Sequence, residues 1–286
     1  MRYTTWHKII IGDSRRMNEL EDESIHLVVT SPPYVTSKFR KGQPFPIDEY
    51  LQLVKDVFKE VYRVLIPDGR FCLNVADVRT KYYYKDDGRL YRIPLAHWVL
   101  QVCLDLGFRL LETYIWNKGF NRHMGGAPGP FFGSYPYPGT IFSQVYWEYV
   151  FVLVKPGPKR KVDPQIKELS KLDFKKWAEY TRQIWRVESE TEWVKSHPSV
   201  FPVEIPMRFI EMYSFVGDTI LDPFLGSGTT TLAAKLTGRN SVGYEINPKY
   251  LSLIKARVGI GQPTLNGAQH HFEVIIREDA TESEWI

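Results

Sequence analysis

The chain has 286 residues, of which 43% are hydrophobic and 14% aromatic, and it carries a formal net charge of +4. Such a chain can bury a sizeable core in one large domain or in a domain with a lobe. No apolar run approaches the roughly 20 residues of a membrane-spanning helix, so we exclude a membrane protein and expect a cytoplasmic one.

Cysteine usage excludes two further classes of protein. Cys72 and Cys103 are the only cysteines, and each lies inside an apolar stretch. A disulfide framework and a metal cluster built from cysteine pairs are therefore excluded, and no metal is expected. We expect both thiols to be reduced and buried in the core.

Strand and helix signals alternate along the first 117 residues. Short apolar runs predict strands, and apolar residues at helical spacing predict amphipathic helices. The predicted strands cover 8–12, 25–30, 69–77 and 109–116, and the predicted helices cover 48–67 and 93–107. Asp48 stands where a capping residue would begin the first helix. Such alternation predicts a parallel sheet with helices on both faces.

The segment 118–142 breaks this pattern. It holds six glycines and four prolines among 25 residues, which excludes regular structure, together with six aromatic residues and no acid. A long strand over 145–155 follows, and then a helical-looking stretch in which eight Lys or Arg residues outnumber three acids between Lys155 and Lys176. This local surplus of positive charge on a near-neutral body indicates a surface that faces a polyanion.

Alternation returns in the last third of the chain. Helices are predicted over 204–215, 229–238 and 248–258, and strands over 218–222 and 241–246. After these elements the sequence offers one edge strand, HFEVII, and an acidic tail to which no role is assigned.

A glycine-rich loop, DPFLGSGTT, joins the strand at 218–222 to the helix that follows it. Gly226 and Gly228 allow positive φ and close approach of a ligand to the backbone, and the helix start offers free N–H groups. A phosphate loop would need Lys and then Ser or Thr after its second glycine, and Thr229 and Thr230 stand there instead. A nucleoside triphosphate is therefore disfavoured.

Glu245 ends the next strand, 19 residues after Gly226. Nucleoside sites in doubly wound sheets place an acid at this position, where it accepts hydrogen bonds from the two ribose hydroxyls. A dinucleotide fingerprint would have a third glycine where Thr231 stands. The pattern fits a nucleoside without a pyrophosphate, and S-adenosylmethionine matches that description.

A second motif, TSPPY at 30–34, ends the second predicted strand. The carboxyl ends of parallel strands face the ligand crevice, so the motif should face the same crevice as the glycine loop. Pro32 and Pro33 stiffen the backbone and remove two N–H donors, which leaves carbonyl acceptors. The Ser31 hydroxyl and the Pro32 carbonyl can then hold the two N–H groups of an exocyclic amine, so that its lone pair attacks a methyl group. Tyr34 offers a face on which a planar base can stack.

Together these motifs resemble those of the amino-group DNA methyltransferases of restriction-modification systems, in which Asp, Asn or Ser precedes Pro-Pro-Tyr. The cofactor loop of that family resembles DPFLGSGTT. A catalytic motif that comes first, with the cofactor loop near the end, is the order of the beta class. Further motifs of the class are similar to GDS at 12–14, FCLNVAD, IWNKG at 115–119 and HPSVFPVEIP at 197–206, in the usual order. The resemblance covers about residues 6 to 258.

The resemblance implies roles for particular residues. Ser31, Pro32, Pro33 and Tyr34 would form the catalytic motif. Within the S-adenosylmethionine site, Asp13 would meet the adenine amine, Glu245 the ribose and the glycine loop the methionine part. The full set of implied cofactor contacts is Asp13, Phe201, Pro202, Asp222, Pro223, Phe224, Gly226, Ser227, Gly228, Thr229 and Glu245. Trp116 would lie on the side of the target base, unless it is a core residue.

The resemblance also implies an α/β fold, a Rossmann-like methyltransferase sheet of strand order 3-2-1-4-5-7-6 with strand 7 antiparallel. The motif order predicts this sheet in permuted chain order, with both motifs ending adjacent strands. The predicted division is a catalytic part (1–117), a target-recognition insertion that includes the antiparallel strand (118–195), a cofactor-binding part (196–260) and a C-terminal extension (261–286).

The expected substrate is double-stranded DNA with the target base flipped out of the duplex. Expected DNA contacts are the basic residues after TSPPY, in the glycine-rich segment and in the basic run: Lys38, Arg40, Lys41, Arg122, Lys159, Arg160 and Lys161. Carbon-5 methylation of cytosine needs a nucleophilic Cys, typically next to Pro, and neither Cys has that setting. In the family, Ser in the first motif position usually accompanies N4-cytosine and Asp usually accompanies N6-adenine, so Ser31 favours cytosine over adenine.

The alternatives are an N6-adenine enzyme, an RNA or protein amide methyltransferase, a P-loop hydrolase, and a DNA-binding module without activity. The RNA and protein enzymes usually carry the cofactor loop before the catalytic motif, the reverse of this chain. A binding module has no need of Glu245 beside a glycine loop. Candidate protein partners are a cognate restriction endonuclease and a second copy of the chain, and DNA binding would place the protein at the nucleoid.

Overall fold

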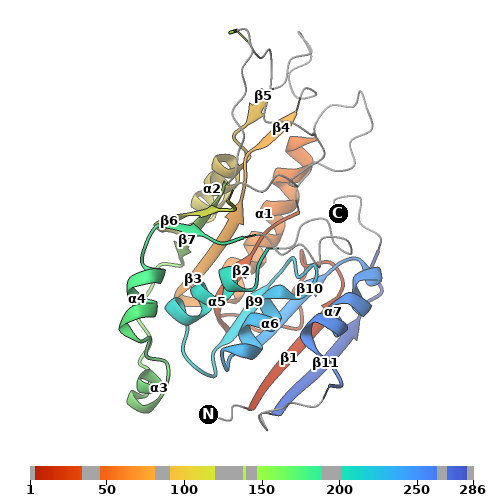
Figure 1. The fold of residues 1–286 in the computed structure, drawn as a ribbon. Coiled ribbons are helices and arrows are strands. Elements are labelled where there is room, and N and C mark those ends of the chain that lie inside the picture. Colours follow the sequence, from red (N-terminus) through yellow and green to blue (C-terminus); the bar gives the residue numbers. More distant parts are fainter. Residues whose placement is uncertain are drawn as a thin grey trace.

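The computed structural model describes residues 4–33, 46–80, 91–119, 138–139, 147–188, 201–262 and 269–281. A nine-stranded sheet runs through the molecule in the order β11-β1-β10-β9-β2-β3-β7-β6-β8 (Figure 1). Its parallel centre consists of β1 (Thr4–Ile11), β10 (Asn240–Glu245), β9 (Thr219–Asp222), β2 (Ile25–Thr30) and β3 (Leu65–Val75). Next to β3, β7 (Trp147–Val154) is antiparallel both to β3 and to β6 (Arg109–Asn117).

This order confirms the predicted fold class. From β1 to β6 the sheet reads 3-2-1-4-5-7-6 when β9 is counted as its first strand, and strand 7 is the antiparallel β7. The segment HFEVII forms most of β11 (Gln269–Ile276), an edge strand paired with β1, as predicted. The other edge strand, β8 (Ile184–Arg186), was not predicted because three residues carry no periodic signal. The proposed domain limits stay a prediction.

Helices cover both faces of the sheet, and alternate residues of the strands pack against them. Val28 of β2 packs with α1 (Ile47–Val64) and α2 (Leu95–Asp105). Its neighbours Leu27 and Val29 pack on the other face with α5 (Glu204–Tyr213) and α6 (Thr229–Leu236). Because both faces are covered, β2 reads in the sequence as an apolar run that only His26 interrupts. At the β1 side, α7 (Leu251–Val258) follows a short 3₁₀ turn, η1 (Pro248–Tyr250), and joins a third cluster with Ile9 and Ile11.

The remaining elements lie at the two ends of the sheet. A two-stranded hairpin of β4 (Val78–Thr80) and β5 (Tyr91–Ile93) stands beyond the carboxyl ends of the parallel strands (Figure 1). Two short helices, α3 (Pro164–Leu169) and α4 (Phe174–Tyr180), lie toward the opposite end and begin with the capping residues Asp163 and Asp173.

One predicted cap is wrong. α1 begins at Ile47 after Pro46, and no side chain caps it. Asp48 lies inside the first turn, where its negative charge is favourable next to the positive end of the helix dipole. The cysteine prediction is confirmed, since Cys72 and Cys103 are free and fully buried. Within the described ranges, no helix is long and apolar enough to cross a membrane, and no group of three His, Cys, Asp or Glu side chains is arranged to hold a metal ion.

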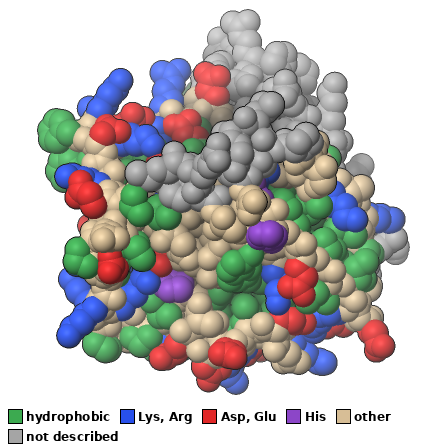
Figure 2. Space-filling view, turned by 90° about the horizontal axis from the view of Figure 1, so that it is seen from below, with side chains coloured by type: hydrophobic (Ala, Val, Ile, Leu, Met, Phe, Trp, Pro, Cys, Tyr) green, Lys and Arg blue, Asp and Glu red, His purple; other side chains and the backbone are tan. Residues whose placement is uncertain are grey.

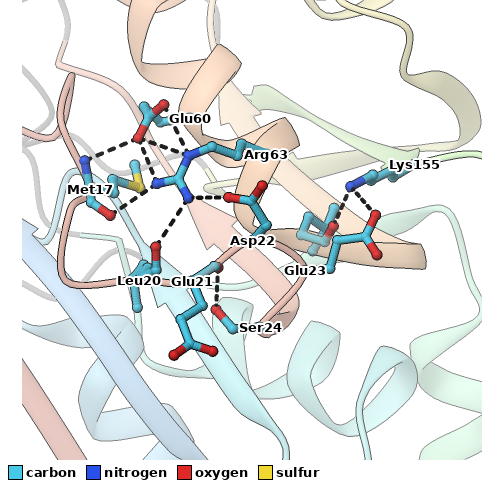
Figure 3. A network of polar contacts seen from close by, with 10 residues as sticks. Met17, Leu20, Glu21, Asp22, Glu23, Ser24, Glu60, Arg63 and Lys155 are labelled. Atoms are coloured by element: carbon cyan, nitrogen blue, oxygen red, sulfur yellow. Dashed lines mark hydrogen bonds and ion pairs between the residues drawn. The ribbon is translucent and has the colours of Figure 1, made fainter.

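The connection between β1 and β2 is fixed by Arg63 of α1 (Figure 3). Its guanidinium donates to the Met17 and Leu20 carbonyls at 3.0 and 3.1 Å and pairs with Asp22 at 2.6 Å. Glu60, one turn earlier, pairs with Arg63 and accepts from the Met17 N–H. These contacts hold the loop after β1, which carries Asp13, against the body of the molecule.

A buried histidine predicts acid sensitivity of the sheet. His7 of β1 is hydrogen-bonded to Thr5 at 2.9 Å and to Ser241 of β10 at 2.8 Å. Burial, with the nearby His270 and Lys235, lowers its pKa to about 3. The neutral ring is therefore favoured in the fold, and its stabilising contribution is present above the unfolded pKa near 6.5 and is lost as the pH falls from there toward 3. We expect the free energy of unfolding to drop by about 2 kcal/mol between pH 7 and pH 5 from this group.

Urea unfolding at both pH values checks this expectation. A His7→Gln variant keeps a hydrogen-bonding side chain that does not titrate, and it should lose most of that pH dependence. His97 is more than half exposed on α2, so His97→Gln is the matched control and should keep the wild-type dependence. An unchanged pH dependence in His7→Gln would contradict the assignment.

Candidate active site

The two sequence motifs meet at the carboxyl end of the sheet. β2, which ends at Thr30, is paired with β9, which ends at Asp222. The Thr30 hydroxyl donates to Asp222 Oδ1 at 2.6 Å, and both side chains are buried. The residues after these strand ends, Ser31 and the glycine loop, therefore start from neighbouring points although about 190 positions separate them. Sequence reasoning gave no role to Thr30, which joins the two motifs.

The loop after β9 requires glycine at two positions. Gly226 and Gly228 have φ of 54° and 87°, in the left-handed region that glycine adopts without strain. At Gly228 an added Cβ would also meet Val258 Cγ2 at 3.0 Å. Gly228 is the N-cap of α6, so the N–H groups of the first turn lie next to the loop. Ser227 and Thr229 are buried there with their hydroxyls 3.2 Å apart.

Asp222 has a buried carboxyl group, and one of its two oxygens accepts hydrogen bonds within the fold. Oδ1 accepts from Thr30 and, at 3.0 Å, from the Phe224 N–H. Oδ2 is buried and has no hydrogen-bond partner of ordinary geometry among the described residues. Burial raises the pKa of Asp222 to about 6, although the Thr30 and Thr230 hydroxyls and the Phe224 N–H lower it in part; the Thr230 hydroxyl also lies 3.3 Å from the Val29 carbonyl. A cationic ligand group at Oδ2 would satisfy this oxygen and restore the charged form.

Glu245 ends β10, the strand on the other side of β9. Oε2 accepts from the Gly226 N–H at 2.9 Å, and Oε1 accepts from the Asn247 N–H at 2.8 Å. The carboxyl group is thus tied directly to the glycine loop. Burial raises the pKa of Glu245 to about 7, with the backbone donors acting in the opposite direction. Each carboxyl oxygen retains a lone pair that can accept from a ligand hydroxyl.

Asp13 follows β1, whose last residue, Ile11, is in register with Glu245. Its carboxyl group accepts from the Arg15 N–H at 2.9 Å and from Arg15 Nε at 2.8 Å. Burial would raise the pKa of Asp13, but the Arg15 contacts outweigh it and the pKa is lowered. Asp13 is therefore charged at neutral pH, and an adenine amine would have to share it with Arg15. A polar hollow of about 370 Å³ beside it is lined by Asp13, Arg15, Arg16, Asp56, Lys59 and Glu60.

These three carboxyl groups fit S-adenosylmethionine. Asp222 Oδ2 is an unsatisfied buried acceptor for an ammonium group, Glu245 offers acceptors for a diol, and the glycines leave the backbone between them open to close approach. Pro223 and Phe224 continue the loop from Asp222, and Phe224 packs into the core beside Phe58. Phe201 and Pro202 precede α5, which leads into β9, so they lie at the same end of the sheet. Their contacts with the cofactor stay a prediction.

The C-terminal segment contributes to this end of the site, which the sequence did not indicate. Asp279 Oδ1 accepts from the Asp13 N–H at 3.4 Å, and the Thr281 N–H donates to the Ile246 carbonyl at 3.0 Å. A Cβ on Gly12 would meet Asp279 Oδ1 and Arg277 Cδ at 2.8 Å. Residues 277–281 are thus packed against the loop of Asp13 and against the residue after Glu245.

Asp279→Ala is expected to weaken S-adenosylmethionine binding about fivefold, because one hydrogen bond to the Asp13 loop is worth roughly 1 kcal/mol. Isothermal titration calorimetry measures the dissociation constant. Glu273→Ala on β11 is the matched control: it removes an acid that pairs with Lys8 on the surface and should leave the constant unchanged. Equal affinities of wild type and Asp279→Ala for S-adenosylmethionine would show that residues 277–281 do not contribute to cofactor binding.

The catalytic motif is described as far as Pro33. Ser31, Pro32 and Pro33 follow β2 at the carboxyl end of the sheet, and Ser31 Oγ lies 3.3 Å from Asn74 Nδ2 of β3. Tyr34 lies outside the described residues. Trp116 is buried in the core with its indole N–H donating to the Val187 carbonyl at 2.8 Å, so the core interpretation of this residue holds.

The structure does not bring the basic run to the site. Lys155, Lys159, Arg160 and Lys161 come after the antiparallel β7, which ends beside the amino ends of the parallel strands. Arg160 is ion-paired with Asp218, the residue before β9, and stacks over Phe215 at 5.2 Å. Lys155 donates to Leu65 O and pairs with Glu23. The position of Lys159, Arg160 and Lys161 therefore gives no support to a DNA contact near the catalytic motif.

Figure 2 views the molecule from below the view of Figure 1, the end where the amino ends of the parallel strands lie. Lys and Arg side chains are interspersed there with acidic and hydrophobic ones. Lys171 pairs with Glu168, and Lys176 pairs with Glu211. Four of the eight basic residues of the run are thus ion-paired with acids. The other expected contacts, Lys38, Arg40, Lys41 and Arg122, lie outside the described residues.

Comparisons with known proteins agree with this geometry. Residues 25–256 match the family model for N6 and N4 methyltransferases, described as DNA methylase. Type II methyltransferase M.MjaI of Methanocaldococcus jannaschii is 34% identical, with 96% of this chain and 98% of the relative covered. M.MthZI of Methanothermobacter thermautotrophicus is 31% identical over 89% and 77% of the two chains.

Two solved structures share the fold over nearly the full chain. A Thermus thermophilus protein assigned as a DNA modification methylase, in complex with S-adenosyl-L-methionine, superposes with a TM-score of 0.73 at 34% identity and covers 94% of this chain and 99% of its own. The PvuII DNA methyltransferase, cytosine-N4-specific, superposes with a TM-score of 0.67 at 25% identity, covering 94% and 96%.

Proposed function

This chain belongs to the DNA methylase family of amino-group methyltransferases, and from that premise we propose that it methylates N4 of cytosine at a specific site in double-stranded DNA. As a Type II DNA amino-methyltransferase it uses S-adenosylmethionine. The observation that carries the methyl-transfer part of the proposal is the hydrogen bond between Thr30 and Asp222, which joins the catalytic motif to the cofactor loop.

The cofactor supplies an electrophilic sulfonium methyl group when it is bound. Asp222 would hold the ammonium group of its methionine part, Glu245 would accept hydrogen bonds from the ribose, and Asp13 would lie at the adenine end. Ser31 Oγ and the Pro32 carbonyl accept the two N–H groups of the target amine. This orients the nitrogen lone pair toward the methyl group and draws it out of conjugation with the ring. Each N–H group of the target amine donates to one of these two acceptors. One of the two hydrogens can therefore leave as a proton after the nitrogen has received the methyl group.

Two observations support cytosine as the target base. Ser31 stands in the motif position where family members that modify adenine usually carry Asp. The PvuII enzyme, described as cytosine-N4-specific, shares the fold at 25% identity. Carbon-5 chemistry is disfavoured further, because Cys72 and Cys103 are fully buried and burial raises the pKa of both thiols. N6-adenine methylation is the alternative product within the same family.

Nucleoside mass spectrometry tests the proposal. Unmethylated plasmid DNA is incubated with the protein and S-adenosylmethionine that carries a deuterated methyl group, and the nucleosides are then released and separated. We expect labelled N4-methylcytosine. Labelled N6-methyladenine would overturn the base assignment but not the enzyme class, and no labelled nucleoside would overturn the proposed activity.

A restriction endonuclease with the same recognition sequence is the partner that we propose, because the matching relatives are Type II methyltransferases. Plasmid DNA methylated by this protein should then resist cleavage by that endonuclease. Association with a second copy of the chain is a separate proposal that sedimentation of the free protein would test.

A further inference from the structure

A chain of buried polar contacts leads from Ser31 away from the cofactor loop. Asn74 Nδ2 lies 3.3 Å from Ser31 Oγ and 2.7 Å from Glu148 Oε2. The other oxygen of Glu148 is ion-paired with Lys118, whose ammonium group lies 4.6 Å from the centre of the Trp116 ring. Asn74, Glu148 and Trp116 come from the adjacent strands β3, β7 and β6, and Lys118 directly follows β6, at the end of the sheet where Ser31 lies.

The carboxylate of Glu148 fixes the direction of the Asn74 amide. A carboxylate only accepts hydrogen bonds, so the amide atom that faces it must be Nδ2; a flipped amide would bring two oxygens together. In this direction Nδ2 also has a hydrogen on the side of Ser31. The Ser31 oxygen accepts it, and the Ser31 O–H bond must then turn away from Asn74. The remaining lone pair of Ser31 Oγ can therefore point in only a few directions.

Lys118 is the ion-pair partner of the buried Glu148 carboxylate. Asn74 and Glu148 are 4% and 6% exposed, and a buried carboxylate is costly unless it is paired and hydrogen-bonded. Lys118 is itself held over Trp116, and the Trp116 indole is anchored to Val187 just after β8. The contacts thus extend across four strands, and none of them is needed to form the cofactor loop.

We propose that Glu148 is a positioning residue of the methyl-transfer reaction. Held by Lys118, it sets the Asn74 amide and, through Asn74, the direction in which Ser31 Oγ accepts a hydrogen bond from the target amine. This inference rests on the proposed role of Ser31 and extends it to Glu148, which reaches Ser31 through Asn74.

A double-mutant cycle tests the inference. Glu148→Gln keeps the shape but allows either amide direction at Asn74, and it should lower kcat about ten- to a hundredfold, since small misplacements of reacting groups cost this much. The dissociation constant for S-adenosylmethionine and the KM for DNA should not change. In a Ser31→Ala background the same substitution should have no further effect on kcat, because the group that it positions is absent. Glu112→Gln, exposed on β6, is the matched control and should behave as wild type.

Two results would overturn the inference: wild-type kcat in Glu148→Gln, or an equal loss in both backgrounds, which is what a purely structural role produces. Lys118→Met takes the place of Glu148→Gln in the cycle if the latter does not fold. Crystal structures of wild type and variant give a readout without activity, and an unchanged contact between Asn74 and Ser31 in the variant would also overturn it. A wild-type protein that methylates no DNA contradicts the proposed function instead, and the crystallographic comparison still tests Glu148.

Discussion

Ser31→Ala is expected to lower the rate of methyl transfer by about 10²–10³-fold, the loss typical of removing one preorganised polar contact to a reacting group. The hydroxyl is the side-chain acceptor of the motif, and it comes directly after Thr30, whose bond to Asp222 fixes the strand end. Alanine leaves that bond, the two prolines and the cofactor loop in place. We therefore expect kcat to fall while the dissociation constant for S-adenosylmethionine stays the same.

Single-turnover transfer of a labelled methyl group to plasmid DNA measures this rate, and calorimetry measures cofactor affinity. Ser24→Ala is a matched control, because Ser24 lies in an exposed turn where its hydroxyl donates only to the Glu21 carbonyl. It should retain the wild-type rate. A Ser31→Ala enzyme with near-wild-type turnover would remove the role of the hydroxyl and leave the Pro32 carbonyl as the main acceptor.

Asp222→Asn is expected to raise the dissociation constant for S-adenosylmethionine by about 30- to 1000-fold, because losing the charged partner of a buried ammonium costs roughly 2–4 kcal/mol. Asn can still accept from Thr30 and from the Phe224 N–H, so the loop geometry should persist. The raised pKa means that the ionised carboxylate destabilises the folded protein at neutral pH. The melting temperature should therefore not fall in the variant, which separates a binding defect from unfolding.

The same pKa values predict how binding depends on pH. The pKa of Asp222 is about 6 and that of Glu245 about 7 in the free protein, so both groups are largely protonated at pH 5. Wild-type affinity should be low there, rise as the pH increases through 6 and 7, and level off near pH 8. Asp222→Asn should lose the lower part of this dependence. Asp105→Asn, an exposed carboxylate on α2, is the control and should match wild type throughout.

The fold could be predicted from the sequence because the signals for its strands and loops are local. The apolar runs of β1, β2, β9 and β10 and the loops after them are each readable within ten residues, since strand burial and tight turns are set by neighbouring positions. The permuted sheet followed from the order of two motifs, and the strand pairings confirm it. The Asp48 cap failed because the N-cap position is taken by Pro46, so the helix begins two residues earlier than a cap at Asp48 would place it.

Only the tertiary structure decided the contacts between residues far apart in the chain. By itself the sequence predicted that Ser31 and the loop from Asp222 carry the chemistry, because residue types and spacing can be read locally. Strand pairing alone decided that Thr30 bonds to Asp222, that Glu148 reaches Asn74, and that Asp279 packs against Asp13. It also decided that the basic run lies at the other end of the sheet, because β7 runs antiparallel and leads the residues after it away from the site. The number of basic residues in a segment does not show at which end of the sheet they lie; the direction of the preceding strand decides that.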